Sequence, residues 1–253
     1  MKQHDFYYVP PENIDKNTVT FSGAELKHLK VVKRKRVGNI VQVVDGAGGA
    51  YTVELTQIDA KKAEGKIHKK TRYLGEPNFQ LTLAQAIPKG NRFDLIIEKC
   101  TEIGVSHFIP LITDRTIPSA GEAKLKRWQK VAVAAMKQCA RSVLPEIKSP
   151  QALESVLTGK EIYDFQLMAH PDETNKSLTD TILEQKQKIN HLPRIKKGIL
   201  LIGPEGGFTL TEAAKAREWN YNPFSLGQRR LRSETAGIVA SGIIMELLDN
   251  SSS

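Results

Sequence analysis

The sequence has little cysteine and no long apolar run, and these two absences exclude several classes of protein. Among its 253 residues are only two cysteines, Cys100 and Cys139, which lie outside any Cys-x-x-Cys motif and far from a His pair at metal-ligand spacing. We therefore expect reduced thiols and no metal. The longest apolar segment, GIVASGIIMELL, is shorter than the roughly 20 residues that span a bilayer. The N-terminal MKQHDFYYVP lacks the apolar core of a signal peptide. A cytoplasmic protein without membrane contact is expected.

Two common nucleotide-binding motifs are also missing from a glycine-rich loop that follows a predicted buried strand. The apolar run Ile199–Ile202 leads into Gly203-Pro204-Glu205-Gly206-Gly207, without the Gly-Lys-Ser/Thr of a Walker loop or the Gly-x-Gly-x-x-Gly of a dinucleotide site. Glu205 would repel a phosphate, whereas the glycines let the backbone approach a ligand closely. The loop favours a ligand that is not held through phosphate. A tight turn without a ligand is the alternative.

Positive charge is in excess and unevenly distributed. The net charge is +9, and residues 1–72 hold 14 Lys and Arg against 8 Asp and Glu. The densest run is KHLKVVKRKR, residues 27–36, in which Lys33, Arg34 and Arg36 are candidate RNA contacts. Clustered cations bind a phosphate backbone by releasing its counterions. A solvated surface that keeps the protein soluble is the alternative.

The hydrophobic pattern divides the chain near Gly75. Residues 1–74 contain short β-branched segments separated by turns, which indicate a small antiparallel sheet or barrel. We interpret DGAGGA, residues 45–50, as a hairpin turn because strands flank it on both sides. Residues 75–253 alternate apolar strands with amphipathic helices, which predicts an α/β domain on a parallel sheet. Its strands are predicted over residues 79–87, 107–113, 164–170, 196–203 and 222–227, and its helices over residues 92–105, 124–140, 177–189, 209–219 and 233–248.

A second loop is expected beside the first, because parallel sheets bind ligands beyond the carboxyl ends of their strands. LGQRRLRSETAGIVASG, residues 226–242, leaves a short strand, passes three arginines and enters a helix near Ser233. Arg229, Arg230 and Arg232 are expected to face the pocket or its rim, and Arg229 and Arg230 are candidate RNA contacts. Thr209 and Glu212 have the spacing of a capping box, which starts a helix directly after the glycine loop. The last helix is apolar on more than one side and favours a subunit interface as well as a core contact.

These segments carry a family resemblance. ILLIGPEGGFTLTE and LGQRRLRSETA, together with KGNRFDLIIEKCTEIGVSHFIPLITDR and AMKQCARSVLPEI, closely resemble the RsmE family of ribosomal RNA methyltransferases in the SPOUT superfamily. The resemblance implies an N-terminal PUA-like β-barrel that binds RNA (1–74) and a C-terminal SPOUT α/β methyltransferase domain with a trefoil knot and a dimer interface (75–253). It further implies a homodimer, S-adenosylmethionine as methyl donor, and N3 of a uridine in the decoding region of small-subunit (16S) ribosomal RNA, or of the assembled subunit, as target.

The resemblance also implies site residues. The methyl donor would be held by Met168, Ala169, His170, Ile202, Gly203, Pro204, Glu205, Gly206, Gly207, Leu226, Gly227 and Leu231. Further RNA contacts implied by the family pattern alone are Arg92, Arg115 and Arg141. The sequence departs from the usual pattern at Gln228 and Ser233, and at Asp5, where an arginine is usual and an RNA contact is therefore in doubt.

Uracil chemistry then gives roles to two residues at the start of the last helix. N3 of uracil carries a proton at neutral pH and is a poor nucleophile until that proton leaves. We expect Arg232 to stabilise the charge that builds on a uracil carbonyl, and Glu234 to accept the proton or to orient Arg232. A purely structural carboxylate at the helix start is the alternative for Glu234. For His170 an isolated histidine at a strand end is the alternative to a ligand contact.

Two other functions remain open from the sequence. The protein could be an RNA-binding assembly factor that keeps the fold without catalysis, or a methyltransferase of the same superfamily that acts on transfer RNA. Binding of S-adenosylmethionine separates the first from an enzyme, and the RNA that becomes methylated separates the second.

Overall fold

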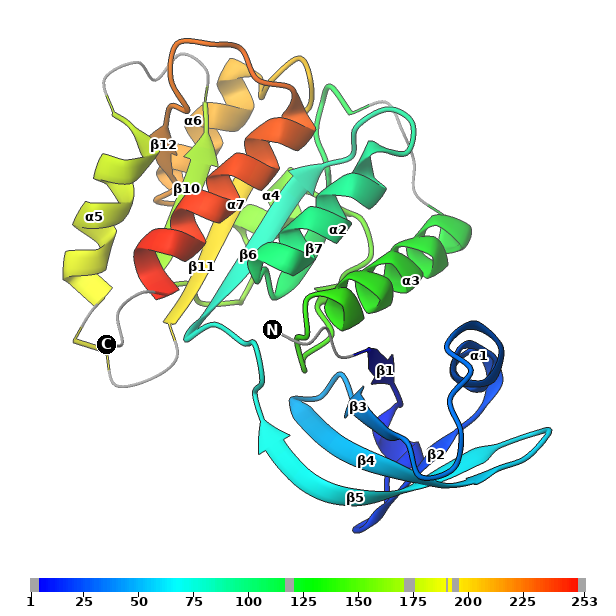
Figure 1. Ribbon diagram of the computed structural model, residues 1–253. Helices are drawn as coiled ribbons and strands as arrows, with labels where there is room; N and C mark the ends of the chain where they lie inside the picture. Colours follow the sequence, from blue (N-terminus) through cyan, green and yellow to red (C-terminus); the bar gives the residue numbers. More distant parts are fainter. Residues whose placement is uncertain (1–4, 117–120, 171–175, 190, 193–195, 250–253) are drawn as a thin grey trace. The chain divides into compact units, whose positions relative to one another are not determined.

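The chain forms two compact units. Figure 1 shows a computed structural model of the protein, which describes residues 5–116, 121–170, 176–189, 191–192 and 196–249. One unit consists of Met1–Glu76 and Val133–Leu144, and the other of Pro77–Ala132 and Pro145–Ser253. Cys100 and Cys139 are both free cysteines. No helix among the described residues is long and apolar enough to cross a membrane.

The first unit is built on a five-stranded sheet with the strand order β1-β3-β4-β5-β2. The strands are β1 (Phe6–Tyr8), β2 (Thr18–Phe21), β3 (Ile40–Val44), β4 (Gly49–Ile58) and β5 (Ala63–Arg72), and the short helical segments are η1 (Pro11–Asn13), α1 (Gly23–Lys27) and η2 (His28–Val32). β1 pairs with β3 in parallel, and the remaining neighbours are antiparallel. Side chains that alternate along these strands form one apolar core, which includes Tyr7, Phe21 and Leu55. The predicted sheet is confirmed, while β1 and the helical segments were not predicted.

The segment DGAGGA closes the β3–β4 hairpin, as predicted. The Asp45 carboxylate accepts hydrogen bonds from the backbone N–H groups of Ala47 and Gly49, both at 2.8 Å, and from the Tyr51 hydroxyl at 2.9 Å. Gly46 and Gly48 have φ angles of +74° and +94°, which favour glycine. These bonds hold the turn within the hairpin, and the Gly48 N–H donates outside it, to the Ser142 carbonyl at 3.0 Å.

The two units differ from the predicted 1–74 and 75–253 at residues 75–76 and in one internal segment. Residues 133–144, predicted in the second domain, group with the first unit. The Glu76 carboxylate explains this, because it accepts hydrogen bonds from the backbone N–H groups of Ser142 and Val143 at 2.9 and 2.8 Å. Val143 also forms β-bridges with Gly46 and Ala47. A sequence pattern cannot show such contacts, because they join residues far apart in the chain.

The second unit is an α/β structure on a parallel sheet, as predicted. Its strands are β6 (Phe79–Ala86), β7 (His107–Ile112), β8 (Glu146–Ile147), β9 (Gln151–Ala152), β10 (Phe165–Ala169), β11 (Lys196–Ile202) and β12 (Asn222–Phe224). Its helices are α2 (Arg92–Ile103), α4 (Leu153–Leu157), α5 (Leu178–Ile189), α6 (Leu210–Glu218) and α7 (Ser233–Asp249), and α3 (Glu122–Gln138) begins in this unit and continues into segment 133–144 of the first. The strand order is β12-β10-β11-β6-β7-β8, β9 also pairs with β7, and all pairs are parallel.

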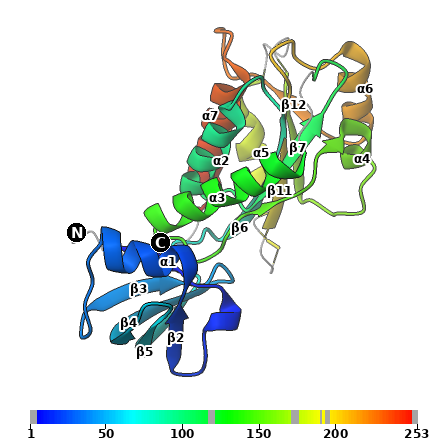
Figure 2. The same cartoon turned by 90° about the vertical axis from the view of Figure 1, so that its right-hand side faces the viewer.

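Helices cover both faces of this sheet, so its interior strands are buried on both sides. Figures 1 and 2 show α2, α5 and α7 on one face and α4 and α6 on the other. On the α4 and α6 side the core includes Leu153, Met168, Leu201 and Ala216. This double burial explains the near-continuous apolar run in β11. Because β10, β11 and β12 are parallel neighbours, the loops that follow them emerge at one edge of the sheet.

Candidate active site

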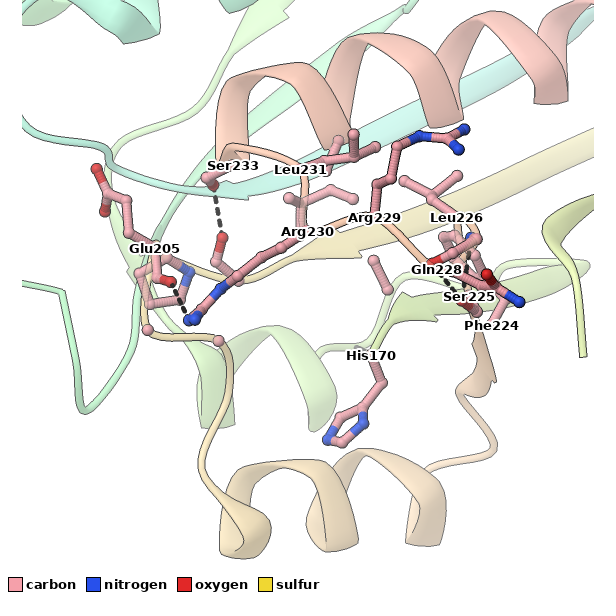
Figure 3. A pocket seen from close by; sticks show the side chains of 18 residues that line it. His170, Glu205, Phe224, Ser225, Leu226, Gln228, Arg229, Arg230, Leu231 and Ser233 are labelled. Carbon is pink, nitrogen blue, oxygen red and sulfur yellow. Dashed lines mark hydrogen bonds between the residues drawn. The ribbon is translucent and has the colours of Figure 1, made fainter. Parts of the chain in front are cut away.

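The end of β10 at Ala169 and His170, together with the loops that follow β11 and β12, encloses a cavity of about 420 Å³. It is lined by Ala169, His170, Ile202, Gly203, Pro204, Glu205, Gly206, Gly207, Phe224, Ser225, Leu226, Gly227, Gln228, Arg229, Arg230, Leu231, Ser233 and Ala236. Figure 3 shows the side chains around it, with His170 on one wall and the arginine-bearing loop on another. The two loops singled out in the sequence therefore share one pocket, of a size typical for small-molecule sites.

The loop after β11 is a tight turn that ends in a capped helix. The Gly207 N–H donates to the Pro204 carbonyl at 2.8 Å, and Gly207 has a φ angle of +69°, which favours glycine. Thr209 and Glu212 then form the predicted capping box, with the Glu212 N–H donating to Thr209 Oγ1 at 3.2 Å and the Thr209 N–H to Glu212 Oε2 at 2.8 Å. A buried strand and a capped helix thus hold this loop at both ends.

Three arginines from separate parts of the chain contact this same loop. Arg115, after β7, donates to the Gly206 carbonyl at 2.5 Å. Arg230, before α7, donates to the Glu205 carbonyl at 3.4 Å, as Figure 3 shows. Arg92, at the start of α2, donates to Glu205 Oε1 at 3.2 Å. Glu205 is thus balanced by cations, and all three arginines, predicted as RNA contacts, contact the loop itself.

The loop after β12 is closed by its own serine and joined to the first loop. The Gly227 N–H donates to Ser225 Oγ at 3.1 Å, and Gly227 has a φ angle of +98°. The Ser233 hydroxyl, at the start of α7, donates to the Gly203 carbonyl at 2.6 Å (Figure 3). This bond fixes the beginning of α7 against the end of β11.

The cavity collects the residues predicted to hold the methyl donor, with one exception. Met168 does not line it: its side chain is fully buried in the apolar core on the α4 and α6 side. Because side chains alternate along a strand, the neighbouring Ala169 comes to the cavity instead. The Met168 side chain thus packs in the core, and a contact of Met168 with the methyl donor stays a prediction.

The two predicted catalytic residues lie in different environments at the start of α7. Arg232 is exposed, whereas Glu234 is 7% exposed. Among the described residues, no hydrogen bond or salt bridge joins their side chains; the cation beside Glu234 Oε1 is Arg92, whose Nε lies 3.6 Å away. Glu234 Oε2 is buried and has no hydrogen-bond partner among these residues. An orienting contact from Glu234 to Arg232 is therefore not present.

The basic run predicted to contact RNA is partly neutralised. Lys33 Nζ lies 2.5 Å from Asp5 Oδ1, and Lys35 Nζ lies 3.6 Å from Asp5 Oδ2. The hydrogen bond from Lys33 contributes most to holding the pKa of the Asp5 carboxyl below its usual value. Arg34 and Arg36 are exposed, and neither forms a salt bridge within the described part of the chain. Both guanidinium groups therefore stay available to a polyanion.

Arg141 requires a correction. Only 2% of it is exposed, and its guanidinium donates to Glu76 Oε2 from Nη2 at 2.8 Å and from Nε at 3.1 Å. A buried guanidinium held by a buried carboxylate cannot reach an RNA phosphate. Arg141 instead ties segment 133–144 to the first unit.

The sequence analysis missed several cavity residues and one residue behind them. Phe224, Ser225, Gln228, Ser233 and Ala236 line the cavity without having been assigned to the methyl donor. Behind the wall, the buried amide of Gln85 donates to Ser233 Oγ at 2.8 Å. A glutamine inside the apolar stretch FQLTLAQAI is the signal that would have found it.

Neither metal chemistry nor a cysteine nucleophile is supported by side chains near the cavity. Within the described ranges, no group of three or more His, Cys, Asp or Glu residues is arranged to hold a metal ion. Burial raises the pKa of the Cys100 thiol to about 12, so this thiol stays protonated near neutral pH. The chemistry of the cavity rests on its backbone groups, arginines and carboxylates.

This fold and pocket define an RNA methyltransferase. Residues 75–245 match the RNA methyltransferase domain family, and residues 21–67 match the RNA methyltransferase PUA domain family. The chain belongs to the ribosomal RNA small subunit methyltransferase E family. A member from Synechocystis is 35% identical, over 96% of this chain and 77% of its own length. A member from Bacillus subtilis is 26% identical, over 90% of this chain and 89% of its own length. The resemblance seen in the sequence is confirmed.

Solved structures with a bound ligand share the fold. The ribosomal RNA small subunit methyltransferase E of Neisseria gonorrhoeae, bound to S-adenosyl methionine, is 28% identical and superposes with a TM-score of 0.82 over 96% of this chain and 98% of its own. A methyltransferase from Legionella pneumophila in complex with the same cofactor is 27% identical, with a TM-score of 0.80 over 96% and 98%.

Proposed function

We propose that this protein transfers a methyl group from S-adenosylmethionine to small-subunit ribosomal RNA, at N3 of a uridine in the decoding region. The observation that carries the proposal is the cavity formed by the end of β10 and the loops after β11 and β12. Family membership and the cofactor-bound structures of similar fold support the same conclusion.

The residues of the cavity fit this cofactor. S-adenosylmethionine supplies the methyl group from its sulfonium, which is cationic, so a phosphate cradle is unnecessary. The backbone of Gly203–Gly207 and of Leu226–Gly227 borders the cavity and offers N–H and C=O groups at close approach. The carboxylate of Glu205 is compatible with a cationic ligand, and Arg92 already balances it.

The chain's own residues would then prepare the target base. Glu234 Oε2, buried and without a hydrogen-bond partner among the described residues, is the proposed acceptor of the N3 proton. Arg232 is the proposed donor to the uracil carbonyl on which charge builds. The N3 lone pair forms the new bond to the methyl carbon as the bond from that carbon to sulfur breaks. The methyl group stays on the base and the proton on Glu234, from which it passes to water.

RNA is proposed to bind through exposed cations of both units. Arg34 and Arg36 would contact phosphates. Lys33 would exchange its ion pair with Asp5 for a contact with a phosphate. Arg229 and Arg230 stand at the cavity and are proposed to hold the RNA near the target base. The match of residues 21–67 to an RNA methyltransferase PUA domain supports the proposal of a PUA-like barrel.

The finer architecture is proposed on the same basis. β12 lies at the edge of the sheet, yet the chain returns so that α7 packs on β6 and α2, and Ser233 hydrogen-bonds Gly203 at the end of β11. We propose that this return passes through a preceding loop to form a trefoil knot. Val239 on α7 remains 40% exposed beside buried Ala240, which supports a homodimer through this helix. Action on ribosomal RNA supports a location in the cytoplasm.

One comparison of cells tests the proposed reaction. Nucleosides from ribosomal RNA of cells with and without the protein are measured by mass spectrometry, and purified protein is titrated with S-adenosylmethionine by calorimetry. We expect cofactor binding, and an N3-methyluridine in small-subunit RNA that disappears with the protein. Binding without any methylated nucleoside, or methylation of transfer RNA alone, would contradict the proposed substrate. Absence of cofactor binding would leave an RNA-associating protein.

A further inference from the structure

Gln85 is a buried amide in an otherwise apolar strand at the centre of the sheet. β6 lies between β11 and β7, and Gln85 is 0% exposed. Burying an amide is costly unless it is hydrogen-bonded. Its Nε2 donates to Ser233 Oγ at 2.8 Å, across 148 positions of sequence. The amide therefore has a specific partner in the cavity wall, although Gln85 itself does not line the cavity.

The hydrogen bonds run in one direction, from Gln85 through Ser233 to Gly203. The Ser233 hydroxyl has a single proton, and it donates this proton to the Gly203 carbonyl at 2.6 Å. Ser233 Oγ must then accept from Gln85, which requires the amide nitrogen to face it. If the amide were reversed, its oxygen would compete with Gly203 for the one hydroxyl proton. The relay thus fixes the orientation of the amide.

The packing around Gln85 depends on a glycine in α7. A Cβ placed on Gly237 would lie 2.2 Å from Gln85 Oε1, well inside any permitted contact. Glycine inside a helix is less favourable than alanine, so its presence there needs a reason. Its presence in the second turn of α7 is explained by the close approach of this amide.

The relay joins the two main walls of the cavity. Gly203 is the first residue after β11, Ser233 is the first residue of α7, and both line the cavity. The geometry points to Gln85 as a positioning residue, which holds these two walls at the spacing that the methyl donor requires. This inference rests on the proposed function, in that the ligand of the cavity is S-adenosylmethionine.

Substitutions of the two residues whose side chains form the relay, Gln85 and Ser233, test this inference. Gln85→Leu keeps the size of the side chain and removes the donor, and Ser233→Ala removes the hydroxyl. A net hydrogen bond contributes about as much as a threefold to tenfold change in an equilibrium constant. We expect each variant to weaken S-adenosylmethionine binding by about that factor in calorimetry, with affinity for RNA unchanged. Because both act on one relay, the double variant should bind no more weakly than Ser233→Ala alone.

Ser241 on the same helix provides the matched control. It is a fully buried serine that accepts from the Cys100 thiol at 3.9 Å and does not line the cavity. Ser241→Ala should lower the thermal midpoint and leave the dissociation constant of the cofactor as in the parent. Gly237→Ala displaces the amide without removing it, and should weaken binding of the cofactor by as much as Gln85→Leu does. It serves as the test if Gln85→Leu fails to fold.

The outcomes separate the inference from the proposed function. Parental cofactor affinity in both Gln85→Leu and Gly237→Ala, or additive losses in the double variant, would overturn the role of Gln85. Equal weakening by Ser241→Ala would reduce the effect to general destabilisation and overturn it as well. If the parent protein itself binds no S-adenosylmethionine, the proposed function fails, whatever the variants do.

Discussion

Arg92 Nε lies 3.6 Å from Glu234 Oε1, so the start of α2 supplies the cation that faces the proposed proton acceptor. The same guanidinium donates from Nη1 to Glu205 Oε1 at 3.2 Å. Arg92 thereby connects the loop after β11 with the first turn of α7. Side chains from distant parts of the sequence thus hold the site together, and the predictions below test their separate roles.

Replacing Arg92 should reduce turnover more than RNA affinity. Arg92→Gln leaves Glu234 without its cation, and Arg92→Lys offers one point charge where the guanidinium contacts two carboxylates. We expect turnover to fall on the order of tenfold to a hundredfold in both variants, because misplacement of a reacting group has effects of that size. Single-turnover methylation and RNA binding measure the two quantities. The matched control is Arg127→Gln, which removes an ion pair between Arg127 on α3 and Asp94, a residue of α2 like Arg92.

Replacing Arg232 should slow the chemical step without lowering the affinity for the cofactor. Arg232 is exposed and does not line the cavity, so its proposed contact is with the target base alone. Arg232→Ala is expected to lower the turnover number by about 10² to 10³, the usual effect of removing one such donor. The dissociation constant of S-adenosylmethionine should stay as in the parent. Parental turnover in this variant would show that Arg232 is not catalytic.

Removing the charge of Asp5 should strengthen RNA binding. Asp5 pairs with Lys33 and Lys35, so Asp5→Asn releases two cations toward phosphate. The slope of log affinity against log salt should steepen by about 0.7 for each additional phosphate that a released lysine neutralises on single-stranded RNA. Filter binding from low to high salt measures it, and neutralising Lys33, Arg34 and Arg36 should make the slope shallower. The patch is not part of the RNA interface if both slopes equal that of the parent.

The second unit should be less stable in mild acid than at neutral pH because of His107. Burial lowers the pKa of His107, and this outweighs the opposing effect of the carboxylates of Glu146 and Glu161, while Lys148 and Lys197 add to the lowering. Below the unfolded-state pKa of about 6.5 the unfolded chain takes up the proton first. Stability is therefore full above that pH, falls as the pH drops toward the folded-state pKa, and is level below it.

A variant that lacks only His107 isolates this effect. The difference in thermal midpoint between pH 7.5 and pH 5.5 should shrink in His107→Gln relative to the parent. Equal differences in the two proteins would contradict the assignment.

The long elements of the second unit could be predicted because their hydrophobic periods repeat many times. The strand β11, the capping box of Thr209 and Glu212, and α7 all appear as predicted. The misses are short: β1 has three residues and α4 has five, which is too few to show a period. Which residue of β10 reaches the cavity could not be predicted, because a strand in a doubly covered sheet is apolar on both faces and its pattern does not distinguish Met168 from Ala169.

The sequence by itself determined the class of fold, the loops after β11 and β12 that border the cavity, and the excess of basic residues near the N-terminus. These features depend on local periodicity, glycine placement and charge, all of which are readable along the chain. The partners of the charged and polar groups were decided only by the tertiary structure. It paired Arg141 with Glu76, Lys33 with Asp5 and Arg92 with Glu234, and it linked Gln85 to Gly203 through Ser233. The physical reason is that a buried charge or amide needs a partner, and which partner it finds depends on strand order and helix packing rather than on distance along the chain.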